Sequence, residues 1–181
     1  QDKTIRDQIA LGHVFRDEEF RKNLFFELQG TYSSRSALLM FQLISKKSDP
    51  AKEKEALLKE IRATFPEAML GEREDGFSCF VYGVGALLAL QTTCERLVQN
   101  FCAMDFSEGE SLSYCKAGGA IYPFVSMSEL YGEAEKALSQ SDGVKIVSDL
   151  GRFYFPRSVL TENNKLVIYE GFLETSRAHY H

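Results

Sequence analysis

Apolar positions along this chain follow two alternating patterns, short continuous runs and stripes with helical spacing. Residues Ser36 to Ile44 form a run of strand length, which is typical of a strand buried on both faces of a sheet. Upstream, Phe20, Leu24 and Leu28 repeat at helical spacing, acids occupy the first turn, and Gly30 follows the last turn. We therefore expect a helix that ends at Gly30 and leads into the first core strand.

The same alternation continues to residue 147 and predicts three further helices. Their buried stripes are Leu57, Leu58, Ile61 and Phe65, then Leu87, Leu90, Cys94, Leu97 and Phe101, then Met127, Leu130, Ala134 and Leu138. Cap signals mark where the first and third of these helices begin. Asp49 precedes Pro50 at one start, and Ser126 has capping-box spacing to Glu129 at the other.

Strand patterns fill the gaps between these helices. Ala68 to Gly71 and Phe77 to Tyr82 enclose the polar segment Glu72 to Gly76, which predicts a β-hairpin with an acidic tip. A strand pattern interrupted by two adjacent glycines runs from Ser111 to Tyr122, and Val144 to Val147 forms a last short strand. The order of elements predicts an α+β fold with a ferredoxin-like core, in which helices pack on a mainly antiparallel sheet of about five strands.

Two segments flank this core, which we place at residues 17–148. Residues 1–16 predict a lead-in helix with Ile5 and Ile9 on one face, a position that often connects to a preceding domain. Residues 149–181 form a C-terminal extension, for which we expect extra strands and a short helix.

Composition narrows the function classes. The chain has 181 residues, of which 44% are apolar, and a formal net charge of −5. Nucleic-acid binders usually carry a basic stripe, so we expect no nucleic-acid partner for this segment. No apolar stretch approaches the roughly 18 residues that a membrane span needs, so we expect no membrane contact by this segment and a cytoplasmic location.

Cysteine and histidine usage does not predict a metal centre. The four cysteines lie on separate predicted elements without a C-x-x-C pair, and we interpret them as buried thiols: Cys79, Cys94, Cys102 and Cys115. The three histidines are too dispersed for a zinc site. No nucleophile and base pair can be nominated, so no catalytic residue is assigned.

Several stretches are similar, in order, to the GGDEF family of diguanylate cyclases. Ala117 to Pro123 is similar to its S-x-G-x-A-x-Y-P strand end, and Glu129 to Leu138 to its e-L-x-x-x-A-D-x-A-L helix. Leu70 to Val81 falls where the family has its R-x-G-G-D-E-F hairpin, and Leu38 to Lys47 on its F-D-x-D-x-F-K strand. The resemblance implies a nucleotide-cyclase-type fold for residues 17–148.

The resemblance also implies where catalytic groups should lie, and those positions are altered. The family holds Mg²⁺ with the first Asp of its F-D-x-D strand, where this chain has Gln42; the second Asp is replaced by Ile44. The hairpin motif here consists of Arg73, Glu74, Asp75, Gly76 and Phe77, in which only Asp75 and Phe77 match. Long charged side chains replace the two glycines and would crowd a nucleotide.

Other positions that the resemblance assigns to ligands are also degraded. The guanine-recognition segment is shortened to Ser45 to Pro50, and Asp142 stands in the place of a phosphate-contacting Lys. The inhibitory R-x-x-D site would fall on Thr64 and Glu67. Asp75 and Lys145 are the possible remnant of a nucleotide site.

We therefore expect a bacterial, catalytically inactive GGDEF-like signalling module without a resident cofactor or metal. The resemblance implies guanine nucleotide or cyclic di-GMP as ligands, and a homodimer or an adjacent output domain as partners. Three alternatives stay open: an active cyclase with an altered metal site that uses Mg²⁺, a structural or ligand-binding middle domain of a transcription regulator, and an unrelated protein that shares a common superfold. The acidic hairpin tip could likewise be a solvated turn or an interaction surface.

Overall fold

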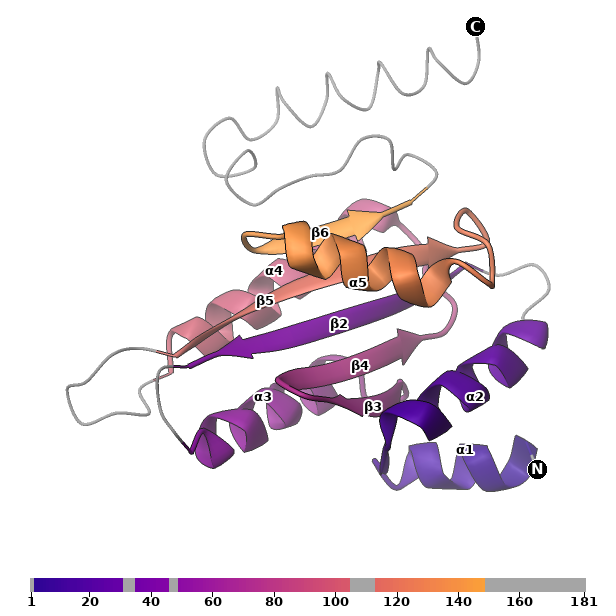
Figure 1. Ribbon diagram of the computed structural model, residues 1–181, viewed down its shortest axis with the longest axis horizontal. Helices are drawn as coiled ribbons and strands as arrows, with labels where there is room; N and C mark the ends of the chain where they lie inside the picture. The colour runs from indigo at the N-terminus through magenta and orange to yellow at the C-terminus, as the bar shows by residue number, and fades with distance from the viewer. Residues whose placement is uncertain (1, 31–34, 46–48, 105–112, 149–181) are drawn as a thin grey trace, which may run out of the picture.

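The computed structural model describes residues 2–30, 35–45, 49–104 and 113–148, and these form one six-stranded sheet with helices on both faces (Figure 1). The strand order is β1-β3-β4-β2-β5-β6. The helices are α1 (Asp2–Ala10), α2 (Asp17–Gln29), α3 (Ala51–Thr64), α4 (Leu87–Cys102) and α5 (Leu130–Gln140). The strands are β1 (Val14–Phe15), β2 (Ser36–Ile44), β3 (Met69–Arg73), β4 (Gly76–Val81), β5 (Tyr114–Tyr122) and β6 (Val144–Val147).

Strand β2 lies at the centre of the molecule, as its continuous apolar run predicts. It pairs antiparallel with β4 on one side and with β5 on the other. Its alternate side chains enter two separate cores because successive residues of a strand point to opposite faces. Leu39 and Phe41 pack in the core beneath α3 and α4, whereas Leu38 and Met40 pack in the core beneath α1, α2 and α5.

The sheet is mainly antiparallel, and the α+β prediction is confirmed. Parallel pairing occurs at the two edges, where β1 lies beside β3 and β6 lies beside β5. The sheet has one strand more than the five expected. The additional strand β1 is only two residues long, Val14 and Phe15, and a pair of residues carries no recognisable periodicity.

The prediction of one lead-in helix over residues 1–16 is wrong in its extent. Helix α1 ends at Ala10, and the chain then turns at Gly12 into strand β1. The apolar face of α1 is not free, because Ile5 and Ile9 are buried in the same core as Phe20. The lead-in segment therefore packs on this domain and contributes to its sheet.

The predicted hairpin is confirmed, but its tip is narrower than the five polar residues suggested. Strands β3 and β4 continue to Arg73 and Gly76, so only Glu74 and Asp75 form the turn. Glycine is needed at position 76, because a Cβ there would lie 1.8 Å from the backbone oxygen of Phe41. The hairpin can therefore approach β2 closely at this point.

Two further predictions need correction. Strand β5 is not interrupted by Gly118 and Gly119 but runs continuously through them. A Cβ on Gly118 would lie 2.2 Å from the backbone nitrogen of Leu138, so this glycine allows α5 to pack directly on the strand. Helix α5 also begins at Leu130, four residues after the predicted cap Ser126, because the intervening residues form a turn instead.

The cysteine prediction holds for three of the four side chains. Cys79, Cys94 and Cys115 are buried, Cys102 is partly exposed, and none of the four forms a disulfide. The extension over residues 149–181 and its expected strands lie outside the described residues. Within the described part of the chain, no helix combines the length and apolarity needed to cross a membrane.

Candidate functional site

The hairpin, the end of β2 and helix α5 enclose a surface hollow of about 490 Å³. Its lining residues are Gln42, Arg73, Glu135, Lys136, Leu138 and Ser139. Gln42 reaches this place because it pairs with Gly76 across β2 and β4, and Arg73 because it ends β3 beside that pair. Two positions separated by about thirty residues in the sequence therefore line one hollow.

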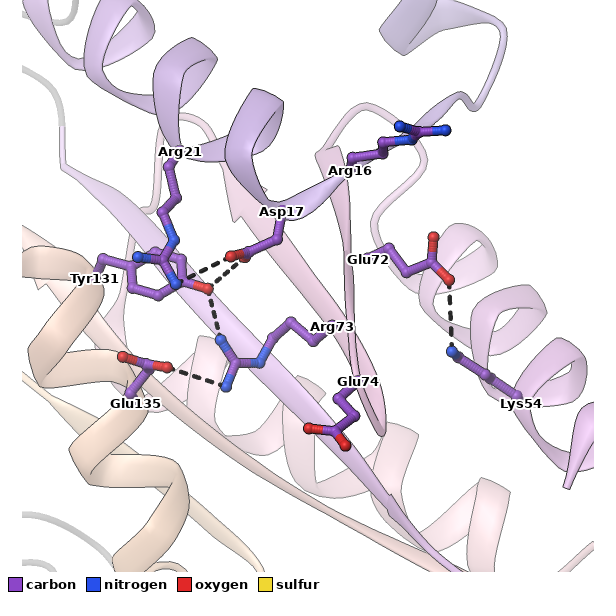
Figure 2. A pocket seen from close by; sticks show the side chains of 9 residues that line it. All are labelled: Arg16, Asp17, Arg21, Lys54, Glu72, Arg73, Glu74, Tyr131 and Glu135. Carbon is purple, nitrogen blue, oxygen red and sulfur yellow. Dashed lines mark hydrogen bonds and ion pairs between the residues drawn. The ribbon is translucent and has the colours of Figure 1, made fainter. Parts of the chain in front are cut away.

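A second hollow of about 440 Å³ adjoins the first and shares Arg73 and Glu135 with it (Figure 2). Its side chains come from the start of α2, from β3 and the hairpin turn, from α3 and from α5. They are Arg16, Asp17, Arg21, Lys54, Glu72, Arg73, Glu74, Tyr131 and Glu135. Four are basic and four are acidic, so the lining carries no net formal charge.

Arg73 joins the hairpin to two helices. Its Nη1 donates a hydrogen bond to the Tyr131 hydroxyl at 2.6 Å, and its Nη2 lies 3.3 Å from Oε2 of Glu135. The Tyr131 hydroxyl in turn donates to Oδ1 of Asp17 at 2.5 Å, and Arg21 pairs with the same carboxylate at 2.9 Å. Figure 2 shows these contacts as one chain across the hollow, which we call the Arg73 network.

Tyr131 is the centre of the Arg73 network. The guanidinium of Arg21 lies 4.0 Å from its ring centroid, and that of Arg73 lies 5.7 Å away, so two cations meet one ring. Burial and the hydrogen bond to Asp17 raise the pKa of Tyr131, while the charges of Arg73 and Arg21 oppose that rise. The hydroxyl therefore stays protonated at neutral pH and acts as donor and acceptor together.

The remaining positions of the altered hairpin motif take different places. Glu74 lines the second hollow. Asp75 is exposed in the turn, and its backbone oxygen accepts a hydrogen bond from the Leu43 N–H at 2.6 Å. Phe77 is buried on the opposite face of the sheet, in the core beneath α3 and α4.

Lys145 does not lie beside Asp75. Strands β2 and β5 separate β6 from the hairpin, and Lys145 is buried where it donates to Oε1 of Gln140 at 2.5 Å. Neither hollow of the site includes Lys145 in its lining. The joint role of Asp75 and Lys145 as a nucleotide-binding remnant stays a prediction.

The positions that the resemblance assigns to the inhibitory site lie elsewhere. Thr64 and Glu67 line a hollow of about 210 Å³ at the start of β3. Arg62, which is out of register with the motif, donates to the backbone oxygen of Gly12 and so fastens α3 to the turn after α1. The Arg62 side chain therefore makes a structural contact within the fold.

Sequence reasoning did not find Asp17, Arg21, Tyr131 or Glu135 as site residues. One signal was present, since Tyr131 and Glu135 are four positions apart on one predicted helix and therefore share a face. What could not be seen was that α2 brings Asp17 and Arg21 to the same place. Among the residues that the structure describes, no three His, Cys, Asp or Glu side chains gather closely enough to hold a metal ion.

Comparisons with known proteins identify the fold. No protein-family model matches this sequence, and no curated protein matches it. Among solved structures, it is similar to the active GGEEF domain of a diguanylate cyclase from Vibrio cholerae, with 11% identity and a TM-score of 0.63 over 74% of this chain and 97% of that one.

Two more solved structures support the same assignment. The GGDEF domain of DgcB from Caulobacter crescentus, in complex with c-di-GMP, is 14% identical with a TM-score of 0.62 over 74% of this chain and 88% of that one. The FimX GGDEF domain from Pseudomonas aeruginosa is 16% identical with a TM-score of 0.57, over 74% and 93% of the two chains. The described residues therefore have the fold of GGDEF domains.

Proposed function

We propose that this chain is a catalytically inactive GGDEF-like regulatory module in cyclic di-GMP signalling. In this proposal it binds a guanine nucleotide or cyclic di-GMP without turnover, or pairs with a second copy, and thereby controls an adjacent output domain. The GGDEF fold supports the signalling context, and the DgcB structure with c-di-GMP supports the ligand class.

One observation is the main support for the proposed lack of catalytic activity. Gln42 and Arg73 line the same hollow, and both stand where the resemblance implies groups that serve Mg²⁺ and nucleotide. Mg²⁺ prefers charged carboxylate oxygens, whereas Gln42 offers a neutral amide. Arg73 adds a positive charge that repels a divalent cation. The residues present therefore do not fit a magnesium site of the cyclase type.

Glu135, which also lines the hollow, does not restore a magnesium site. The carboxylate of Glu135 is paired with Arg73 at 3.3 Å, so its charge is already balanced. Removing one carboxylate from a two-metal site costs several kcal/mol, on the order of three decades in rate.

Anionic ligands remain compatible with the hollow, because Arg73 and Lys136 both line it and guanidinium groups bind phosphate well.

The test is to titrate the protein with GTP and with cyclic di-GMP by calorimetry, with and without Mg²⁺, and to assay the same samples for cyclic di-GMP by chromatography. We expect no product. We also expect binding that does not depend on Mg²⁺ and that weakens at least about tenfold, or 1.4 kcal/mol, in the variant Arg73→Met. Lys22→Met is the matched control, because Lys22 is exposed on α2 and does not line either hollow.

Product formation would overturn the proposed inactivity and would favour a cyclase with an altered metal site. Absence of binding for both nucleotides would overturn the sensing role. Dimerisation measured by ultracentrifugation would then decide between the pairing role and a purely structural middle domain of a larger regulator.

A further inference from the structure

Arg73 is the one basic side chain that lines both hollows of the site, among the residues that the structure describes. Both terminal nitrogens of its guanidinium already have a partner. Nη1 donates to the Tyr131 hydroxyl at 2.6 Å, and Nη2 lies 3.3 Å from Oε2 of Glu135. Figure 2 shows the guanidinium directed at α5 by these two contacts. A group that enters either hollow therefore meets an arginine that is already paired.

These two contacts use the donors that an anionic ligand would need. A guanidinium binds a phosphate most tightly through two parallel N–H groups, and both terminal nitrogens of Arg73 contact α5 instead. The carboxylate of Glu135 also lines both hollows, so its negative charge repels an anion in either of them. Glu135 is thus an internal competitor of any phosphate for Arg73.

We propose that Glu135 and Tyr131 hold Arg73 in a self-inhibited position, from which an anionic ligand must release it in order to bind. This inference rests on the proposed function, which supplies an anionic nucleotide as the ligand. Glu135 is the partner that leaves first, because its contact is the longer one and its side chain is 44% exposed and can turn into solvent. The phosphate then takes the place of the Glu135 carboxylate at Nη2.

Release of Arg73 also changes the surroundings of helix α2. The Tyr131 hydroxyl, which accepts from Arg73, donates to Oδ1 of Asp17, the first residue of α2, at 2.5 Å. Asp17 pairs in addition with Arg21, whose guanidinium lies 4.0 Å from the Tyr131 ring centroid. When Arg73 leaves, the Tyr131 hydroxyl loses its donor, and its own bond to Asp17 weakens because linked hydrogen bonds strengthen one another. Ligand binding and the first turn of α2 are therefore coupled, and the coupling is reciprocal.

The first experiment measures anion affinity with the whole chain by calorimetry, with inorganic pyrophosphate and with GTP as the probes. The variant Glu135→Gln keeps the shape of the side chain and removes the competing charge, so we expect both probes to bind at least about tenfold more tightly. Tyr131→Phe should also tighten binding, because it frees Nη1 of Arg73. Glu133→Gln is the matched control, since Glu133 carries the same charge on α5 but lines neither hollow.

The double variant Arg73→Met with Glu135→Gln shows whether Glu135 acts through the arginine. A negative charge that merely repels the ligand would give the same gain whether or not Arg73 is present. Competition for the guanidinium requires the guanidinium, so in the Arg73→Met background we expect Glu135→Gln to tighten binding no more than Glu133→Gln does.

The second experiment needs no ligand. Arg73→Met imitates release of the arginine, so hydrogen exchange followed by mass spectrometry should speed up at least about threefold in the first hydrogen-bonded amides of α2, residues 20–24. Helix α4 lines neither hollow and is the internal reference, which corrects for any loss of overall stability. Pyrophosphate bound to the unaltered chain should have the same effect on α2.

The outcomes separate this inference from the proposed function. Nucleotide binding to the unaltered chain, without any gain in Glu135→Gln over Glu133→Gln, would leave the proposed function standing and would overturn the self-inhibited position. GTP binding to Glu135→Gln alone would instead support self-inhibition and refute nucleotide sensing by the unaltered chain. Absence of pyrophosphate and GTP binding in every variant would refute the inference, as would an equal gain from Glu135→Gln in the Arg73→Met background. Exchange in α2 that does not change relative to α4 would overturn the coupling to α2.

Discussion

The Arg73 network predicts an energetic link between the hairpin and helix α5 that can be measured directly. In the variant Arg73→Met, the hydrogen bond from a charged donor to the Tyr131 hydroxyl is lost, which costs about 1.5–3 kcal/mol. The ion pair with Glu135 adds only about 0.2–1 kcal/mol, because the two side chains are 21% and 44% exposed. Contributions of shared groups are not additive, so we expect a loss of about 2 kcal/mol in the free energy of unfolding.

A double-mutant cycle isolates the contact itself. Tyr131→Phe removes both hydrogen bonds of the hydroxyl and should cost about 1–2 kcal/mol. In the double variant the cost should be smaller than the sum of the two, with a coupling energy of about 1 kcal/mol. Urea unfolding followed by circular dichroism gives these values, provided that the slope with denaturant stays constant.

The control for this cycle is Lys136→Met, which removes one positive charge from α5. Lys136 is exposed and makes no ion pair that the structure records within its described part, so its change should stay within about 0.5 kcal/mol. A coupling energy below about 0.3 kcal/mol between positions 73 and 131 would refute the reasoning. Arg73 would then not hold the hairpin to α5 in solution.

Four further substitutions test the packing and one buried hydrogen bond. Gly118→Ala should destabilise the fold by about 3 kcal/mol in urea unfolding, because its Cβ would meet the α5 backbone at 2.2 Å. Gly132→Ala, which has open space around its Cβ, should instead stabilise the fold by about 0.5–1 kcal/mol. Tyr82→Phe removes a 2.7 Å hydrogen bond to the buried Glu27 and should cost about 1–3 kcal/mol at neutral pH. Ile9→Ala should cost about 2 kcal/mol if α1 is docked as the structure has it.

Tyr82 also predicts a pH dependence with a definite sign. Burial, with the hydrogen bond to Glu27, raises the pKa of Tyr82 well above its ordinary value near 10. The folded chain therefore binds its proton more tightly than the unfolded chain, and this contribution to stability is complete below pH ~10 and is lost as the pH rises above it. Thermal melts should show a shallower decline above pH ~10 in Tyr82→Phe. An equal decline would contradict this assignment. A rise in stability for Gly118→Ala, or no change for Ile9→Ala, would instead contradict the packing predictions above.

The sequence alone determined the order of the main elements and the central place of β2. Both depend on local patterns, since a continuous apolar run must be buried on two faces and a helical stripe on one. The hairpin followed from two apolar segments around a polar one, and the resemblance to GGDEF domains marked both Gln42 and the hairpin as altered positions. Strand β1 escaped detection because two residues carry no period, and its pairing depends on β3 far along the chain.

Only the tertiary structure decided which side chains the altered hairpin contacts. From the sequence, Arg73 was a long charged side chain where a glycine was expected, and its partners could not be named. Tyr131 and Asp17 lie 114 positions apart, yet their hydrogen bond is 2.5 Å long because α2 and α5 cover the same face of the sheet. Long-range contacts of this kind follow from the packing of helices on a sheet, which no local pattern of residues specifies.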